Sequence, residues 1–304
     1  MLTLIVRLNS NNLLIVWFLL ELNIILFIPL HYKQNTNTLN NLIKYFILQR
    51  LAGLILLALI LTQNFLILCK DKNLIIMMVL IIKLGIFPFS SWYFQVTENI
   101  EWHIWFLINT LQKIIPLWLI SNYNNIIVIN IIIILNRLYS SIEIWKQNSI
   151  RWILNSSSLN HVRWILIRLN TNTNNWEIYI IIYCWLSYNI TKILKFNNTK
   201  TLIRNFNYSF TIKIILTITL LNFIRMPPIT GFLPKLLIIK NINSITFLIP
   251  LLINNIFLLF FYLTLIKNLF LKKIYSKKNI TPSFYIITNN GLSISFIFYL
   301  IIIF

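Results

Sequence analysis

The chain has 304 residues, of which 58% are hydrophobic and 11% are charged, and its mean hydropathy is +0.78. Soluble domains carry about 25% charged residues, so this composition excludes an ordinary soluble globular protein. The formal net charge of +20 does not indicate nucleic-acid binding, because Lys and Arg are spread through apolar segments and short loops and form no compact basic domain.

Helices are the predicted secondary structure. The apolar runs are long and show little alternation, unlike the strands of a membrane barrel, and the chain has only four glycines for tight turns. Helices also satisfy every backbone N–H and C=O group inside lipid. We therefore predict an all-α integral membrane protein with about ten transmembrane helices, organised as a single polytopic domain over residues 1–304.

The N-terminal half begins with a predicted span at residues 13–30. Residues 1–11 are too short to cross a bilayer and read as a truncated helix. A loop carrying Glu98 and Glu101 is expected before residue 102. The other spans predicted in this half are 42–68, 74–87, 102–120 and 126–140.

In the C-terminal half, the segment 150–169 is unusual because arginines lie on or beside its Ser/Asn-rich core. Polar connectors are expected at 195–208 and 272–283. The basic cluster at 267–278 is expected either to meet anionic lipid headgroups or to be a solvated loop. The other spans predicted in this half are 176–194, 210–224, 236–252 with a break at Pro250, 256–270 and 284–304.

Metal and cofactor chemistry is not predicted. Cys69 and Cys184 form no CxxC pair, so a disulfide framework or an iron–sulfur site is not expected. His31, His103 and His161 are scattered and show no metal-ligand spacing.

Four ionisable residues lie within or beside the apolar spans: Glu21, Lys83, Lys113 and Lys235. Each charge costs about 2.5–3.5 kcal/mol on membrane-insertion scales, and such residues usually mark ion pathways. A carboxylate at the position of Glu21 must be paired, hydrated or protonated. The alternative is that Glu21 only hydrogen-bonds a neighbouring helix, and that Lys83 snorkels to the membrane interface.

Prolines accompany three of these charges. Pro88 follows Lys83 closely, so the lysine is expected at a broken helix end. Pro116 cannot donate to the carbonyl of Gln112, which leaves a polar group beside Lys113. Lys235 ends the segment 227–235, which contains three prolines and a glycine. This segment is expected either to be a broken helix, as found at the ion sites of transporters, or to be a surface loop. The residues expected to break helices are Pro88, Pro116, Pro227, Pro228, Gly231 and Pro234.

These groups suggest stepwise proton transfer. Moving one buried charge changes the proton affinity of its neighbours, and a row of such sites joined by water can pass protons. The polar residues from Asn155 to His161 are candidates to line a wet path. His161 is a candidate relay, although a lone histidine is as often structural.

The motifs resemble those of the chain 2 family of mitochondrial NADH–ubiquinone oxidoreductase, an antiporter-like membrane subunit of respiratory complex I. In order and spacing they cover roughly residues 18–236. The composition resembles that of insect mitochondrial genes. The matching stretches are Leu20-Glu21-Leu22-Asn23, Phe27-Ile28-Pro29, Ile43-Lys44-Tyr45-Phe46, Lys83-Leu84-Gly85, Pro88-Phe89, Gln112-Lys113, Pro116 and Pro227-Pro228-Ile229-Thr230-Gly231-Phe232-Leu233-Pro234-Lys235.

The resemblance implies an antiporter-like bundle with two helix-break sites and a hydrophilic axis in the mitochondrial inner membrane. The family's proton-conducting glutamate and lysines fall on Glu21, Lys83, Lys113 and Lys235. It implies no cofactor in this chain, with NADH, FMN, iron–sulfur clusters and ubiquinone bound elsewhere in the complex. The implied partners are other complex I subunits, especially neighbouring antiporter-like subunits, and phospholipids, but not nucleic acid.

Several positions differ from the family pattern. A histidine is replaced by Ser90, and the positions that differ around the C-terminal charges are Trp152, Asn155, Arg163 and Ile224-Arg225, the last in place of a Gly-Gly pair. Two alternatives to a complex I subunit remain: a free-standing cation/proton antiporter, and a structural subunit whose charges only hold helices together.

Overall fold

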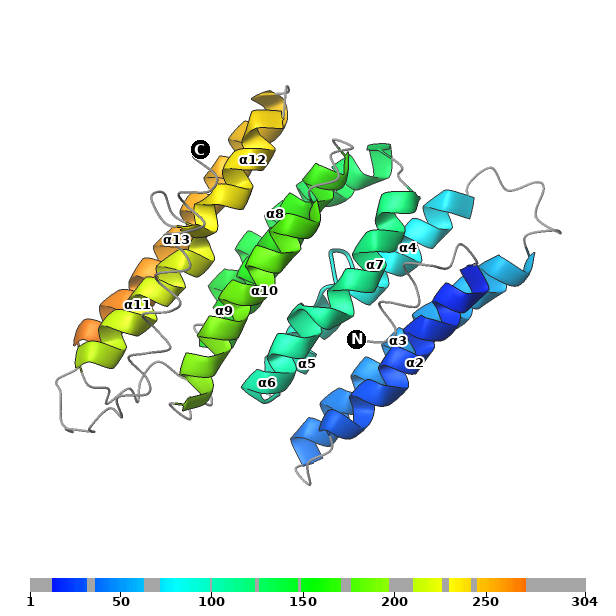
Figure 1. Cartoon of the computed structure of the whole chain (residues 1–304), viewed down its shortest axis with the longest axis horizontal. Helices are drawn as coiled ribbons and strands as arrows, with labels where there is room; N and C mark the ends of the chain where they lie inside the picture. Colours follow the sequence, from blue (N-terminus) through cyan, green and yellow to red (C-terminus); the bar gives the residue numbers. More distant parts are fainter. Residues whose placement is uncertain are drawn as a thin grey trace. The chain divides into compact units, whose positions relative to one another are not determined.

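The structure is a computed structural model, and the residues that it describes are all helical or in short connections between helices (Figure 1). They are residues 13–31, 36–62, 72–98, 100–123, 126–146, 149–170, 176–196, 210–225, 230–241 and 245–271. The predicted N-terminal truncated helix, residues 197–208 of the connector predicted at 195–208, the connector at 272–283 and the predicted span 284–304 lie outside the described residues. Residues 195 and 196 of the first connector are helical instead.

The chain gathers into two compact units, residues 1–136 and 137–304. The helices of unit 1 are α2 (Leu13–His31), α3 (Thr36–Leu61), α4 (Lys72–Leu84), α5 (Ser91–Glu98), α6 (Trp102–Asn109) and α7 (Leu111–Asn122). Helix α8 (Ile126–Lys146) begins in this unit and ends in the next. Within unit 1, α3 packs against α2, α4 and α5, and α7 packs against α4 and α6.

Unit 1 buries charged side chains and exposes large apolar ones. Glu21 is 5% exposed and Lys113 is 4% exposed, whereas Leu26 is 63% exposed and Leu54 is 58% exposed. A protein in water would gain free energy by the opposite arrangement. This distribution suits a protein surrounded by lipid. Apolar side chains on the surface then face hydrocarbon at no cost in free energy, and charged side chains in the interior are kept away from it.

Unit 2 is built around α9 (Ile150–Asn170), whose residues 150–169 are all buried. Helices α10, α12 and α13 pack against α9, and α11 packs against α10 and α13. The other elements of this unit are α10 (Trp176–Phe196), α11 (Phe210–Ile224), the 3₁₀ turn η3 (Thr230–Phe232), α12 (Leu233–Asn241) and α13 (Ile245–Leu271).

The observed helices differ from the predicted spans in several places. Residues 91–98, expected in a loop, form α5, and five of its eight residues are buried. The predicted break at Pro250 is wrong, because α13 runs through it, and the predicted span 236–252 is divided between α12 and α13. Pro250 is the sixth residue of α13, beyond the first four whose N–H groups lack a helical partner, so it removes one backbone hydrogen bond without ending the helix.

Two stretches are long and apolar enough to cross a membrane among the described residues: Leu39–Leu61, and Trp102–Asn122, which comprises α6 and α7. The second is interrupted at Thr110, whose backbone N–H and hydroxyl both donate to the carbonyl of Phe106. The helix break predicted at Pro116 therefore lies at Thr110 instead. Proline constrains the turn that precedes it, and α7 begins within that turn.

Candidate functional site

Glu21 of α2 lies at the centre of a cluster of three charged side chains in unit 1. Its Oε2 atom is 2.7 Å from Nη1 of Arg50 on α3. Its Oε1 atom is 3.7 Å from Nζ of Lys83 on α4. The side chains of Glu21 and Lys83 are 7% and 2% exposed, while that of Arg50 is 32% exposed. A buried carboxylate is thus paired with two cations, and the ion pair to Arg50 is the shorter one.

Gly53 of α3 makes the space that the Glu21 carboxylate occupies. A Cβ atom added at this glycine would overlap the carboxylate oxygen Oε1. The neighbouring helix is held at this point because Trp17 of α2 donates its indole N–H to the Gly53 carbonyl, at 2.8 Å. The absence of a side chain at residue 53 therefore permits the close approach of α2 to α3.

Replacement of Gly53 tests this packing. In the complex I role that the resemblance implies, Gly53→Ala should displace the Glu21 carboxylate and reduce proton pumping several-fold, although alanine is about 1 kcal/mol better than glycine in a helix. The measurement is the number of protons translocated per NADH oxidised in proteoliposomes. Ala58→Gly, at an exposed position of α3, is the control and should lower helix stability without changing pumping. Unchanged pumping in Gly53→Ala would contradict the assigned role of this glycine.

Lys83 is held at the C-terminal end of α4. Gly85 has a φ of 65°, its N–H donates to Ile82, and the N–H of Ile86 donates to Ile81, which together form a Schellman motif. This motif ends α4 at Leu84, four residues before Pro88. It leaves the carbonyl of Lys83 without a donor from its own helix, and Gln49 donates to that carbonyl at 3.1 Å.

Lys113 of α7 is placed by two residues from other helices. Its Nζ atom donates to Oδ1 of Asn109, at 3.0 Å, and lies 4.7 Å from the centroid of the Tyr93 ring. The Tyr93 hydroxyl donates to the same Asn109 oxygen. Asn109 is the last residue of α6 and lies four residues before Lys113, the spacing at which side chains meet along a helix.

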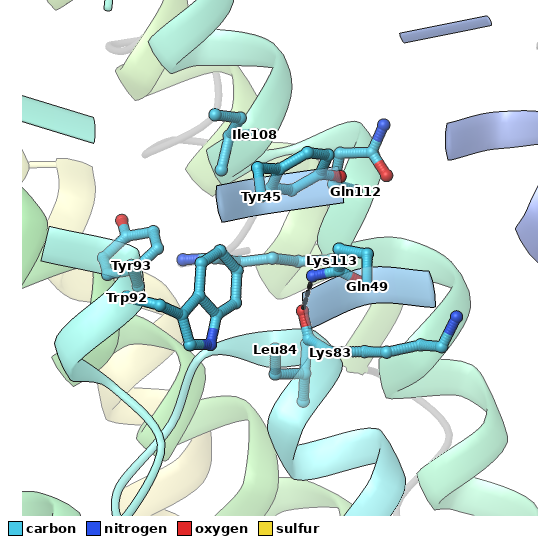
Figure 2. A pocket seen from close by; sticks show the side chains of 9 residues that line it. All are labelled: Tyr45, Gln49, Lys83, Leu84, Trp92, Tyr93, Ile108, Gln112 and Lys113. Carbon is cyan, nitrogen blue, oxygen red and sulfur yellow. Dashed lines mark hydrogen bonds between the residues drawn. The ribbon is translucent and has the colours of Figure 1, made fainter. Parts of the chain in front are cut away.

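A small cavity lies beside Lys83 and Lys113. Its volume is about 10 Å³, close to the least that holds one water molecule. Figure 2 shows the two ammonium groups extending in opposite directions, with that of Lys113 directed toward Tyr93. The cavity therefore borders both lysines without placing their nitrogens face to face. It is lined by Tyr45, Gln49, Lys83, Leu84, Trp92, Tyr93, Ile108, Gln112 and Lys113.

The second charged site, in unit 2, forms where α11 ends. Arg225 follows Ile224 with a φ of 63°, which ends the helix in a conformation that favours glycine. Gly231 of η3 approaches this end closely, because a Cβ atom there would overlap the backbone oxygen of Asn222. The last carbonyls of α11 thus lack helical donors and are available to side chains.

Lys235 and His161 contact these carbonyls. Lys235 of α12 donates to Ile224 O at 3.0 Å, and Nε2 of His161 on α9 is 3.1 Å from Phe223 O. Nδ1 of the same histidine is 3.3 Å from the Tyr179 hydroxyl. A cation at a helix C-terminus is favoured by the helix dipole, so Lys235 is stabilised here although it is only 2% exposed.

Asn255 of α13 joins Lys235 to α9. Its Oδ1 atom accepts from Lys235 at 3.2 Å and from Nδ2 of Asn160 at 3.0 Å. The hydroxyls of Ser156, Ser157 and Ser158 on α9 donate to carbonyls of their own helix, and the Ser157 oxygen also accepts from the Tyr262 hydroxyl at 2.9 Å. Their oxygens can still accept hydrogen bonds, so a wet path along α9 stays a prediction.

Removal of the Asn255 acceptor should be costly. Asn255→Leu would remove the acceptor of the Asn160 amide, at about 1–3 kcal/mol for an unsatisfied buried group, and would leave Lys235 with the Ile224 carbonyl. In the complex I role that the resemblance implies, we expect a lower melting temperature of the assembled complex together with slower proton pumping. Ile253→Leu, at a position that is 41% exposed on the same helix, is the control. A melting temperature equal to that of the parent complex would show that Asn255 does not hold Lys235.

The structure thus brings Glu21 and Lys83 together, with Lys113 across the cavity, and places His161 and Lys235 at one helix end. Pro234 lies in the first turn of α12, while Pro227 and Pro228 lie outside the described residues. Arg50, Gly53, Asn109 and Asn255 were missed because their importance comes from contacts between helices. One signal was available: Arg50 is an arginine within an apolar segment.

Comparison with known proteins gives consistent results. Residues 10–261 match the family described as NADH:quinone oxidoreductase/Mrp antiporter, TM. NADH-ubiquinone oxidoreductase chain 2 of Anopheles gambiae is 36% identical over 286 residues, which are 88% of this chain and 82% of that protein. The protein of the same name from Hylobates lar is 31% identical, over 85% of this chain and 80% of that one.

Solved structures show the same fold at low sequence identity. A chain of respiratory complex I from Thermus thermophilus, with bound aureothin, has a TM-score of 0.76 and 18% identity over 90% of this chain and 69% of that one. A chain of the Mrp complex from Dietzia sp. has a TM-score of 0.73 and 11% identity over 90% of this chain and 58% of that one. The chain therefore belongs to the NADH:quinone oxidoreductase/Mrp antiporter family of membrane proteins, and within it to the chain 2 family of NADH-ubiquinone oxidoreductase.

Proposed function

We propose that this chain is a core membrane subunit of respiratory complex I and takes part in the proton translocation that accompanies NADH oxidation by ubiquinone. It acts in the mitochondrial inner membrane as a multi-pass protein of about ten transmembrane helices. Its partners are other complex I subunits, especially neighbouring antiporter-like subunits, and phospholipids. NADH, FMN, iron–sulfur clusters and ubiquinone are bound elsewhere in the complex.

The observation that carries this proposal is the burial of ionisable groups in apolar helices. Glu21, Lys83, Lys113 and Lys235 are all between 2% and 6% exposed, and intramembrane ionisable residues of this kind usually serve ion or proton pathways. Lys83 and Lys113 also border a cavity close to the size of one water molecule. In the proposed mechanism, redox energy released elsewhere shifts the protonation of the Glu21–Lys83 pair. That shift then biases Lys113 and Lys235.

The experiment that tests the proposal is purification of the chain in mild detergent. We expect it to co-purify with rotenone-sensitive NADH oxidation in a large assembly. A free-standing cation/proton antiporter would instead be extracted as a small particle without NADH oxidation, and this outcome would refute the assignment. The alternative of a purely structural subunit is tested by exchanging the charges of Glu21 and Lys83. If these charges only hold helices together, pumping should survive the exchange.

A further inference from the structure

Arg50 belongs to the Glu21 cluster, but it was not among the site residues predicted from the sequence. Its guanidinium is 1 Å nearer to the Glu21 carboxylate than the Lys83 ammonium is, at 2.7 Å against 3.7 Å. Arginine holds its proton under all conditions in proteins, whereas a lysine can exchange its proton when buried. The two cations that share Glu21 therefore differ in whether they can change charge.

The balance of charge in the cluster depends on this difference. With Lys83 protonated, two cations face one carboxylate. When Lys83 gives its proton to a water molecule, Arg50 and Glu21 remain as a complete ion pair. Without Arg50, the same proton release would leave Glu21 as an unpaired buried anion, which is strongly unfavourable.

We propose that Arg50 is a positioning residue that keeps the Glu21 charge compensated, so that Lys83 is the group of this cluster that releases and regains a proton. The inference rests on the proposed function, in which these groups carry protons. Two features of the packing support it. Gly53 leaves room for the Glu21 carboxylate beside α3, and the Lys83 carbonyl is fixed by Gln49 of the same helix.

The charged and titratable groups around the cluster come from every helix packed against it. Arg50 is contributed by α3, and Glu21 and Lys83 face one another from α2 and α4. The adjacent cavity adds Lys113 of α7, Tyr45 of α3 and Tyr93 of α5. Of these, Arg50 is the group whose removal changes the fixed positive charge beside Glu21.

The test is Arg50→Gln in the assembled complex, reconstituted in proteoliposomes. Proton pumping at neutral pH should fall by about tenfold or more. Without Arg50 the Glu21 carboxylate needs Lys83 as its counter-ion, so Lys83 keeps its proton. The remaining activity should shift to higher pH, a change that loss of packing alone would not produce. Arg50→Lys should restore most of the rate, because a lysine at this position, where the side chain is 32% exposed, keeps its charge more readily than Lys83, which is 2% exposed. Lys44→Gln, which removes an exposed charge from the same helix, is the control.

A second variant decides the matter if Arg50→Gln does not assemble. Arg50→His carries a side chain whose charge is lost between about pH 5 and pH 8. Its pumping rate, divided by that of Arg50→Lys at each pH, should be near one where the histidine is charged and should approach the ratio of Arg50→Gln once the histidine is neutral. A constant ratio, or pumping of Arg50→Gln at the parental rate across this range, would overturn the role of Arg50. Lys113→Met tests the proposed function separately, so normal pumping in that variant refutes the function itself.

Discussion

Lys113→Met should leave the complex assembled and reduce its proton pumping by about tenfold or more, an effect typical of the loss of a positioned proton-transfer group. Lys113 is 4% exposed, and its ammonium is hydrogen-bonded to Asn109 at 3.0 Å and packed over the Tyr93 ring. Methionine has a similar length and an apolar surface, so the surrounding packing is retained. The measurement is the number of protons translocated per NADH oxidised, together with the amount of assembled complex.

Lys113→Arg separates proton transfer from simple electrostatic support. Arginine keeps the positive charge but does not release its proton, so this variant should also fail to pump. A subunit in which Lys113 only holds neighbouring helices would be restored by arginine. Lys240→Met is the control, because Lys240 is an exposed lysine of α12, and it should pump normally. Pumping by Lys113→Met with unchanged stoichiometry would show that the lysine carries no proton.

Gly231→Ala should cause a large loss of assembly. The added Cβ atom would overlap the backbone oxygen of Asn222 and lie 3.1 Å from Cγ of Arg225. A backbone atom cannot rotate away, so η3 must separate from the end of α11. Overpacking of this kind costs about 1–3 kcal/mol, and occasionally more.

The effect should extend to Lys235, because η3 leads directly into α12. We expect little assembled complex, and a lower melting temperature in whatever complex forms. Thr219→Ser in α11 removes one methyl group from a half-buried position whose hydroxyl bonds its own helix, and it is the control. Normal assembly and melting temperature in Gly231→Ala would mean that η3 does not pack as closely against α11 as the structure places it.

The helical class of the protein followed from composition alone. Long apolar runs with few charges have one way to satisfy their backbone groups in lipid, so the helices at 13–30 and 210–224 were predicted almost to the residue. The end of α11 was also predicted, because the following prolines cannot continue a helix. The end of α4 was displaced, because Gly85 in a left-handed conformation ends that helix before Pro88 is reached.

The amino-acid sequence by itself determined that this is a helical membrane protein with Glu21, Lys83, Lys113 and Lys235 in or beside apolar helices, since hydropathy and proline constraints act between near neighbours in the chain. Only the tertiary structure decided which groups those charges meet. Arg50 of α3 pairs with Glu21 of α2, and Asn255 of α13 accepts a hydrogen bond from Lys235 of α12. These contacts depend on where helices approach one another, which is set by side-chain packing between distant segments.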